Sequence, residues 1–118
     1  MKKAVLESPF AGKVERNVAY AKLCVRDMLL HGEAPIASHL LFTQPGVLDD
    51  NNPEQRKLGI AAGHAWTEIA DYIVVYIDFG FSSGMDAGIR QAALNGTPIE
   101  FRRLPVEQLV KLKEQYPD

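Results

Sequence analysis

Four segments of the chain have the apolar character and boundaries of β-strands. They lie at residues 3–8, 34–42, 72–77 and 97–104, and each is bounded by residues that favour turns. The segment at 72–77 is a nearly unbroken run of β-branched and aromatic residues, which is typical of a strand buried on both faces. We therefore expect this strand to lie in the middle of a sheet.

Apolar residues spaced three and four apart predict a helix after each strand. The first helix follows the turn Ser8-Pro9-Phe10-Ala11-Gly12 and closes at His31-Gly32, because a cation and a glycine suit a helix C-terminus. The second begins at Pro53 behind the N-cap Asn52, after a polar loop at 43–52. The stripe of this helix that is expected to face the core comprises Leu58, Ala61, Ala62, Ala65, Trp66 and Ile69.

The last two helices carry start and stop signals of their own. Ser83 and Asp86 have the spacing of a capping box, and Asn95-Gly96 ends the helix that they begin. Pro105 begins the final helix. The residues of that helix expected to face inward are Val106, Leu109 and Val110.

The alternation of strands and helices predicts an α/β fold of the flavodoxin-like (Rossmann-like) kind, with three layers and a four-stranded parallel sheet. Crossovers of this length are right-handed and place helices on both faces of the sheet. With the first strand between the second and the third, the strand order is 2-1-3-4, and a crevice forms at the C-terminal edge of the sheet. The length suits a single domain over residues 1–118.

Composition narrows the class of protein and its partners. Apolar residues make up 47% and charged residues 24% of the chain, as in globular proteins, and the net charge of −2 gives no footprint for duplex nucleic acid. The single cysteine, Cys24, is expected to be a buried small hydrophobe. No signal peptide is recognised after Met1, and no window approaches the ~20 apolar residues that span a bilayer, so we expect no membrane contact and a cytoplasmic location.

Three polar turns converge on the expected crevice: residues 8–12, Ser38-His39 with the loop that follows, and residues 78–86. The turn Ser82-Ser83-Gly84-Met85 directs the free N–H groups of a helix start toward it, which suits a phosphate, although helix capping explains the serines equally well. His39 is expected at the end of a strand, where it binds a sugar hydroxyl, transfers a proton or has a structural role. No pair of histidines has a metal-ligand spacing, so no metal site is expected. No cofactor is expected either.

Several carboxylates are candidates for chemistry at this edge. Asp78 directly follows the buried strand and is the preferred catalytic candidate, since packing explains a charge there poorly. Asp49, Asp50 and Glu54 are expected in or beside the loop at 43–54, with solvation as the alternative.

The order and spacing of short motifs resemble those of the nucleoside 2-deoxyribosyltransferase-like superfamily, specifically a small branch common in phages and prophages. The resemblance runs from about residue 4 to 102. The motifs are Ser8-Pro9-Phe10-Ala11-Gly12, Glu15-Arg16-Asn17, Ala37-Ser38-His39, Leu48-Asp49-Asp50 and Ser83-Gly84-Met85. The resemblance implies a flavodoxin-like sheet, a homo-oligomer of two or more copies, and a site for nucleosides or nucleotides.

In that superfamily a helical glutamate attacks the anomeric carbon of the sugar, and its place in this chain is taken by Gly88. Asp86 points about 200° around the helix from position 88 and is no simple substitute. The resemblance therefore carries over a binding site without its nucleophile. The ligand-binding residues that it and the turns indicate are Ser8, Phe10, Gly12, Arg16, Asn17, His39, Asp78, Ser82, Ser83, Gly84 and Met85.

Three hypotheses follow for function. The first is a protein that binds a nucleotide or nucleoside and lacks the superfamily nucleophile. The second is an N-glycosidase or deoxyribosyltransferase in which Asp78 or a carboxylate of the 43–54 loop activates water. The third is an oligomeric interaction module, with Trp66 and its neighbours at the interface, although a core position for Trp66 is the commoner outcome.

Overall fold

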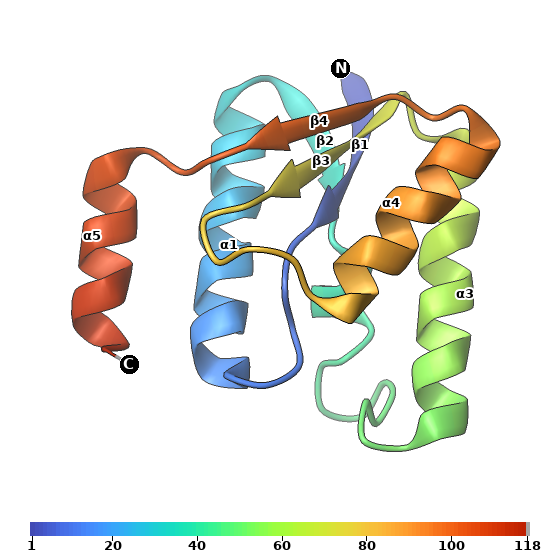
Figure 1. The fold of residues 1–118 in the computed structure, drawn as a ribbon, viewed down its shortest axis with the longest axis horizontal. Coiled ribbons are helices and arrows are strands. Elements are labelled where there is room, and N and C mark those ends of the chain that lie inside the picture. Colours follow the sequence, from blue (N-terminus) through green and yellow to red (C-terminus); the bar gives the residue numbers. More distant parts are fainter. Residues whose placement is uncertain (118) are drawn as a thin grey trace.

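The computed structural model describes residues 1–117 and contains a parallel sheet of four strands, in the order β2-β1-β3-β4. The strands are β1 (Lys2–Glu7), β2 (Glu33–Ile36), β3 (Tyr72–Tyr76) and β4 (Ile99–Arg102). β1 pairs with both β2 and β3, so the two strands with the most buried residues lie in the middle (Figure 1). The predicted flavodoxin-like α/β fold and its strand order are confirmed.

Four long helices cover the two faces of the sheet (Figure 1). α1 (Val14–Leu30) and α5 (Val106–Gln115) lie on one face, and α3 (Pro53–Ile69) and α4 (Ser83–Asn95) lie on the other. The predicted N-cap Asn52 is confirmed, since its side chain accepts hydrogen bonds from the N–H groups of Glu54 and Gln55. Gly96 ends α4 in the left-handed conformation, as its sequence predicts.

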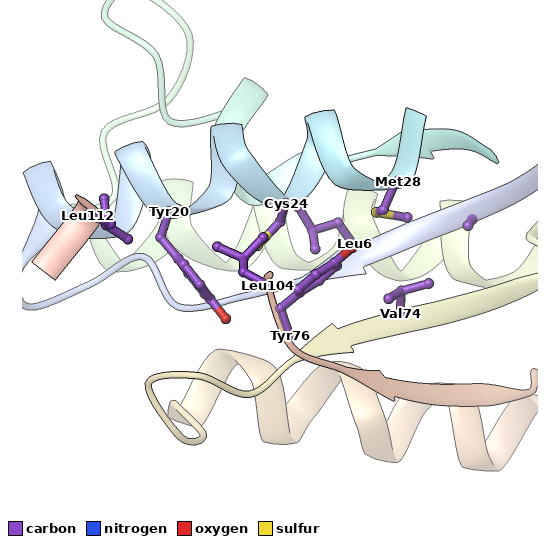
Figure 2. Packing of buried hydrophobic residues seen from close by; sticks show 9 residues of the cluster. Leu6, Tyr20, Cys24, Met28, Val74, Tyr76, Leu104 and Leu112 are labelled. Atoms are coloured by element: carbon purple, nitrogen blue, oxygen red, sulfur yellow. The ribbon is translucent and has the colours of Figure 1, made fainter. Parts of the chain in front are cut away.

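The side chains of β1 and β3 alternate between two cores. The larger core lies between the sheet, α1 and α5 and contains the buried thiol of Cys24 (Figure 2). Its buried members are Ala4, Leu6, Tyr20, Cys24, Met28, Val74, Tyr76, Leu104 and Leu112. The second core packs Val5 and its neighbours on β3 against Met85 and Ala92 of α4. Successive strand residues face opposite ways, so Glu7 continues the Val5 side, toward α4.

The second strand is shorter than predicted, and His39 is not at its end. β2 pairs only with β1, and that pairing stops at Ile36 opposite Val5. Beyond Ala37 the chain turns into a short helix, α2 (Ser38–Leu41), which packs against α3. A Cβ atom on Gly63 of α3 would lie 2.7 Å from Oγ of Ser38, so a glycine is needed for this close approach.

Two predictions about helix faces and one about a helix cap are wrong. The apolar stripe of α3 is largely exposed, with Trp66 44%, Leu58 61% and Ile69 66% accessible, because α3 packs inward through Gly63 and Thr67. On α5, Val106 and Val110 are exposed and Leu112 is buried. The N-cap of α4 is Ser82 rather than Ser83, and Ser82 forms its capping box with Met85 rather than with Asp86.

A network of hydrogen bonds and an ion pair joins the strands on the face of the sheet that α1 and α5 cover, opposite the face of Glu7. Arg102 of β4 donates to both carboxylate oxygens of Glu33 on β2, at 2.8 and 3.0 Å. Tyr72 of β3 also donates to Glu33, and these donors lower the pKa of that carboxyl. Tyr76 donates to Asp27 of α1 at 2.5 Å. The network links three strands and a helix.

No helix within residues 1–117 is long and apolar enough to cross a membrane.

Candidate functional site

A cavity opens at the C-terminal edge of the sheet, between the end of β1, α2, α3 and the start of α4. The cavity has a volume of about 110 Å³ and is partly open to solvent. Its lining is Glu7, Ser8, Phe10, Ala11, Ser38, His39, Phe42, Thr43, Leu48, Asp50, Gln55, Arg56, Gly59, Ile60, Gly63, His64, Ser82, Ser83, Gly84 and Met85. A second hollow includes Gly12 and the 45–51 loop. The residues that line both hollows are Phe10, Ala11, Thr43, Leu48, Asp50 and Gln55. The two hollows therefore adjoin.

Buried Ser8 and partly buried His39 form a polar pair on one wall of the cavity. Ser8 Oγ lies 2.6 Å from Nε2 of His39, and the hydroxyl comes from the turn after β1 while the imidazole comes from α2. Burial lowers the pKa of His39 from 6.5 to about 4. The imidazole is consequently neutral at physiological pH and acts as a hydrogen-bonding group rather than as a cation.

Glu7 and Gly88 meet on the inner wall. Glu7 is the last residue of β1, and Gly88 lies on the buried face of α4, one turn from Met85. A Cβ atom on Gly88 would lie 2.3 Å from Oε1 and 2.8 Å from Oε2 of Glu7. The carboxyl of Glu7 thus fills the space that any side chain at position 88 would enter.

The Glu7 carboxyl has no hydrogen-bond donor or cation beside it among residues 1–117. Burial alone raises its pKa from 4.5 to about 8. At pH 7 the group is mostly protonated and is able to donate a hydrogen bond or a proton.

The start of α4 offers N–H groups to the cavity. Ser82 caps the helix by accepting a hydrogen bond from Met85 N at 3.2 Å, so one N–H of the first turn is used internally. The N–H groups of Ser83 and Gly84 belong to the part of a helix that has no partner in its own ladder. Both residues line the cavity, and a Cβ atom on Gly84 would contact only Ser82 Oγ, at 3.9 Å. The arrangement suits an anionic group.

Charge at the opposite wall comes from α3 and the loop before it. Arg56 Nη1 donates to Asp50 Oδ2 at 3.0 Å, so this carboxylate is paired with a cation. Asp49 accepts from Asn51 N in the same loop and borders only the second hollow. Glu54 is exposed in the first turn of α3 and is not part of either lining.

Asp78 lies away from the cavity, contrary to expectation. Its Oδ2 accepts from the Tyr20 hydroxyl at 2.7 Å and from Leu104 N at 3.0 Å, on the side of the sheet covered by α1. These bonds anchor the chain after β3 to α1 and to the segment before α5. Packing therefore accounts for a charge at this position.

Arg16 and Asn17 do not line the cavity, but they hold in place a turn that does. Asn17 is buried and donates to the carbonyl oxygens of Phe10 and Ala11, at 2.8 and 3.2 Å. These bonds hold the turn that carries Ser8 and Phe10 into the cavity. The Arg16 guanidinium donates to Asn17 and lies 4.1 Å from the centre of the Phe79 ring.

Of the residues predicted from the sequence, Ser8, Phe10, His39, Ser82, Ser83, Gly84 and Met85 line the main cavity, and Gly12 lines the second hollow. Glu7, Gly63 and His64 line the cavity without having been predicted, whereas Ser38 belongs to a turn that was expected there. Glu7 had a detectable signal, because it is a charge at the end of a central strand, the same signal that favoured Asp78. Gly63 and His64 had none, since only the packing of α3 against α2 brings them to the site.

No cluster of three or more histidine, cysteine, aspartate or glutamate side chains able to hold a metal occurs within residues 1–117.

Comparison with known sequences and structures places the chain in a family and identifies a structural neighbour. Residues 2–102 match the family described as "Domain of unknown function (DUF7768)", and the chain belongs to that family. The search of curated proteins finds no match. Among solved structures, a 2-deoxyribosyltransferase from the psychrotolerant bacterium Bacillus psychrosaccharolyticus is similar, with a TM-score of 0.60 and 20% identity, over 86% of this chain and 72% of that one.

The structural neighbour establishes a shared fold with a deoxyribosyltransferase, as the sequence resemblance predicted. Assignment to a phage-associated branch stays a prediction, because neither comparison bears on it.

Proposed function

We propose that the cavity beside β1 and α4 binds a nucleoside or nucleotide. The observation that carries this proposal is the convergence on one cavity of an aromatic and aliphatic wall, a neutral Ser8–His39 pair and the start of α4. The deoxyribosyltransferase fold of the structural neighbour supports the same ligand class.

Each part of a nucleotide has a matching part of the site. Phe10, Phe42 and Met85 offer apolar surface to a base. Ser8 and His39 offer hydrogen-bonding groups to sugar hydroxyls, and the N–H groups of Ser83 and Gly84 suit a 5′-phosphate.

Isothermal titration calorimetry with the ribonucleoside and deoxyribonucleoside 5′-monophosphates of the common bases tests the proposal. We expect saturable heat with at least one of them, and a weaker affinity after Phe10→Ala. Absence of saturable binding across the whole panel would refute the proposal.

A second candidate function, an oligomeric interaction module, is favoured by the exposed apolar face of α3. This α3 face comprises Leu58, Ala61, Ala65, Trp66 and Ile69. Scattered apolar residues are ordinary on a protein surface, but a continuous strip with a tryptophan is typical of an interface. A second copy of the chain is the occupant we propose, since a two-fold arrangement would pair the strip with itself.

A further inference from the structure

β4 forms one edge of the sheet, and its outer side has no partner strand within residues 1–117. The usual flavodoxin-like order is 2-1-3-4-5, so β4 takes the position that a fifth strand covers in that fold. The strand crosses the front of the sheet in Figure 1, and no helix lies over it. The opposite edge, β2, contains Pro35, and proline is one of the residues that blunt an edge strand. β4 contains no proline, so it is the edge that is open to pairing.

The backbone of β4 presents hydrogen-bonding groups to that outer side. The N–H groups of Ile73 and Ile77 on β3 donate to the carbonyl oxygens of Pro98 and Arg102, at 2.9 and 3.0 Å. In a strand of a parallel sheet, successive residues direct their backbone groups alternately to one side and the other, so the even-numbered residues of β4 face β3. The N–H and C=O groups that point outward are those of Ile99, Phe101 and Arg103.

An aromatic pair lies beside this edge. Phe101 of β4 and Phe81, from the turn before α4, contact each other edge to face, with ring centres 6.1 Å apart. Phe101 is 53% and Phe81 54% exposed, although phenylalanine is among the residue types most often buried. Natural proteins normally avoid apolar surface along an unpaired strand edge, because it favours pairing with another chain. The edge thus has both the backbone groups and the apolar surface that a pairing strand requires.

We propose that a second copy of the chain pairs with this edge, with the two β4 strands antiparallel about a two-fold axis at Phe101. In this register, Phe101 lies opposite Phe101 of the second copy and exchanges both backbone hydrogen bonds with it. The outward groups of Ile99 meet those of Arg103 in the second copy, so every outward group is used. The two four-stranded sheets join into one continuous sheet, and the contact is closed by its two-fold symmetry.

The charges on the other face of β4 favour a copy of the same chain as the partner. Glu100 and Arg102 project from that face and form an ion pair within the strand. The proposed register places Glu100 opposite Arg102 of the second copy, and Arg102 opposite its Glu100, so opposite charges meet twice. A register shifted by two residues would instead set Glu100 against Glu100, or Arg102 against Arg102. The inference goes beyond the proposed function, since neither the cavity nor the α3 face takes part.

Cysteine cross-linking tests both the edge and the register. In the proposed dimer the Cα atoms of position 101 in the two copies lie about 5.5 Å apart, within the range that a disulfide spans. Those of position 103 lie roughly 14 Å apart, which is too far. Under mild oxidation we expect Phe101→Cys to form a disulfide-linked dimer at least about tenfold faster than Arg103→Cys, its exposed control. Wild type should not cross-link, because Cys24 is buried.

A charge reversal tests the match between the two copies while Phe101 and the backbone of the edge stay unchanged. Glu100→Lys sets a lysine against Arg102 of the second copy, so we expect sedimentation velocity to show dimerisation weakened by about fivefold or more. Glu114→Lys makes the same change of charge on an exposed residue near the end of α5 and should leave the association unchanged. Circular dichroism of both variants verifies that they fold.

The α3 face is a separate surface for self-association, and Trp66→Glu distinguishes it from the β4 edge. The cross-link at position 101 should form at the same rate with and without Trp66→Glu. A cross-link that disappears with Trp66→Glu would overturn the inference, as would equal rates for Phe101→Cys and Arg103→Cys. Association that Glu100→Lys leaves unchanged, or a wild-type chain that stays monomeric at all concentrations, would overturn it as well. None of these outcomes bears on nucleotide binding, so the proposed function is tested separately.

Discussion

At the scale of single residues, the pair formed by Glu7 and Gly88 is the unusual feature of this protein. A glycine inside a helix costs about 1 kcal/mol relative to alanine, and a partly buried carboxyl without a hydrogen-bond partner adds a cost of its own. Both costs occur together, on facing positions of α4 and β1. Such paired departures from a stable design are expected where a site has a function.

The contact between these residues can be tested by a double-mutant cycle. Gly88→Ala improves helix propensity but forces the Glu7 carboxyl to move, so we expect little or no gain in the free energy of unfolding. In a Glu7→Ala background the same change should stabilise the protein by about 0.5–1 kcal/mol. Urea denaturation of the four proteins measures the coupling, and equal effects of Gly88→Ala in both backgrounds would show that the two residues do not meet.

The pH dependence of stability reports on the Glu7 carboxyl. The pKa of Glu7 is raised in the folded state to about 8, so between pH 4.5 and pH 8 the folded protein holds this proton more tightly than the unfolded chain does. The free energy of unfolding is therefore highest below pH 4.5 and falls as the pH rises toward 8. Glu7→Gln removes this loss. The stability of the variant relative to wild type should therefore increase by about 1–3 kcal/mol between pH 5 and pH 8.

The lowered pKa of His39 changes the stability of wild type and of Glu7→Gln with pH in the same way, so it cancels when the two are compared. A difference between Glu7→Gln and wild type that does not vary with pH would mean that Glu7 titrates normally.

At the scale of secondary-structure elements, the sequence predicted the features that depend on hydrophobic patterning and on the residues at helix ends. The strand order, the Asn52 cap and the Gly96 terminus follow from patterning and from end chemistry. The buried face of α3 could not be predicted from the sequence. The helix has an apolar stripe, but it packs against its neighbours through the smaller residues Gly63 and Thr67 and leaves the stripe exposed. The turns that line the candidate cavity were predicted from the sequence. The close approach of Glu7 on β1 to Gly88 on α4 was not, because it depends on how two separate elements pack.

The elements of the sheet are also joined by the ion pair between Arg102 and Glu33. Arg102→Met leaves a buried carboxylate with only Tyr72 as its donor, so we expect a loss of about 2–4 kcal/mol in the free energy of unfolding at pH 7. The control Arg103→Met removes an exposed charge and should change stability by less than about 0.5 kcal/mol.

The loss caused by Arg102→Met should shrink toward pH 3. The pKa of Glu33 is lowered in the folded state, so the stability that its ionised form contributes is present above pH 4.5 and is lost as the pH falls. A loss that is the same at pH 3 and pH 7 would contradict a role for the charge.

At the scale of the whole molecule, the two proposals concern different surfaces. The cavity lies at the sheet edge between α2, α3 and the start of α4, while the α3 face defined above points away from the sheet. Binding and self-association can therefore be altered separately.

Self-association is tested by sedimentation velocity at increasing protein concentration. We expect the wild-type chain to form a dimer or larger oligomer and Trp66→Glu to shift it toward the monomer, because the new charge would be buried at the interface. Leu94→Glu is the control, since Leu94 is 83% exposed on α4 and lies outside the α3 face. A wild-type chain that remains monomeric at all concentrations would remove the case for an interface.

The central claim, a nucleotide site at the start of α4, is tested most directly by titrating wild type and Gly84→Glu with a nucleoside and with its 5′-monophosphate. A Cβ atom at position 84 would meet only Ser82 Oγ, at an ordinary contact distance of 3.9 Å, and an acidic residue in the first turn suits the helix dipole. The variant should therefore fold normally. Gly84→Gln controls for the size of the new side chain. We expect the monophosphate to bind wild type more tightly than the nucleoside does, and Gly84→Glu, but not Gly84→Gln, to abolish that advantage. Equal affinities of wild type for both ligands, or an advantage that survives in Gly84→Glu, would contradict a phosphate subsite at this helix.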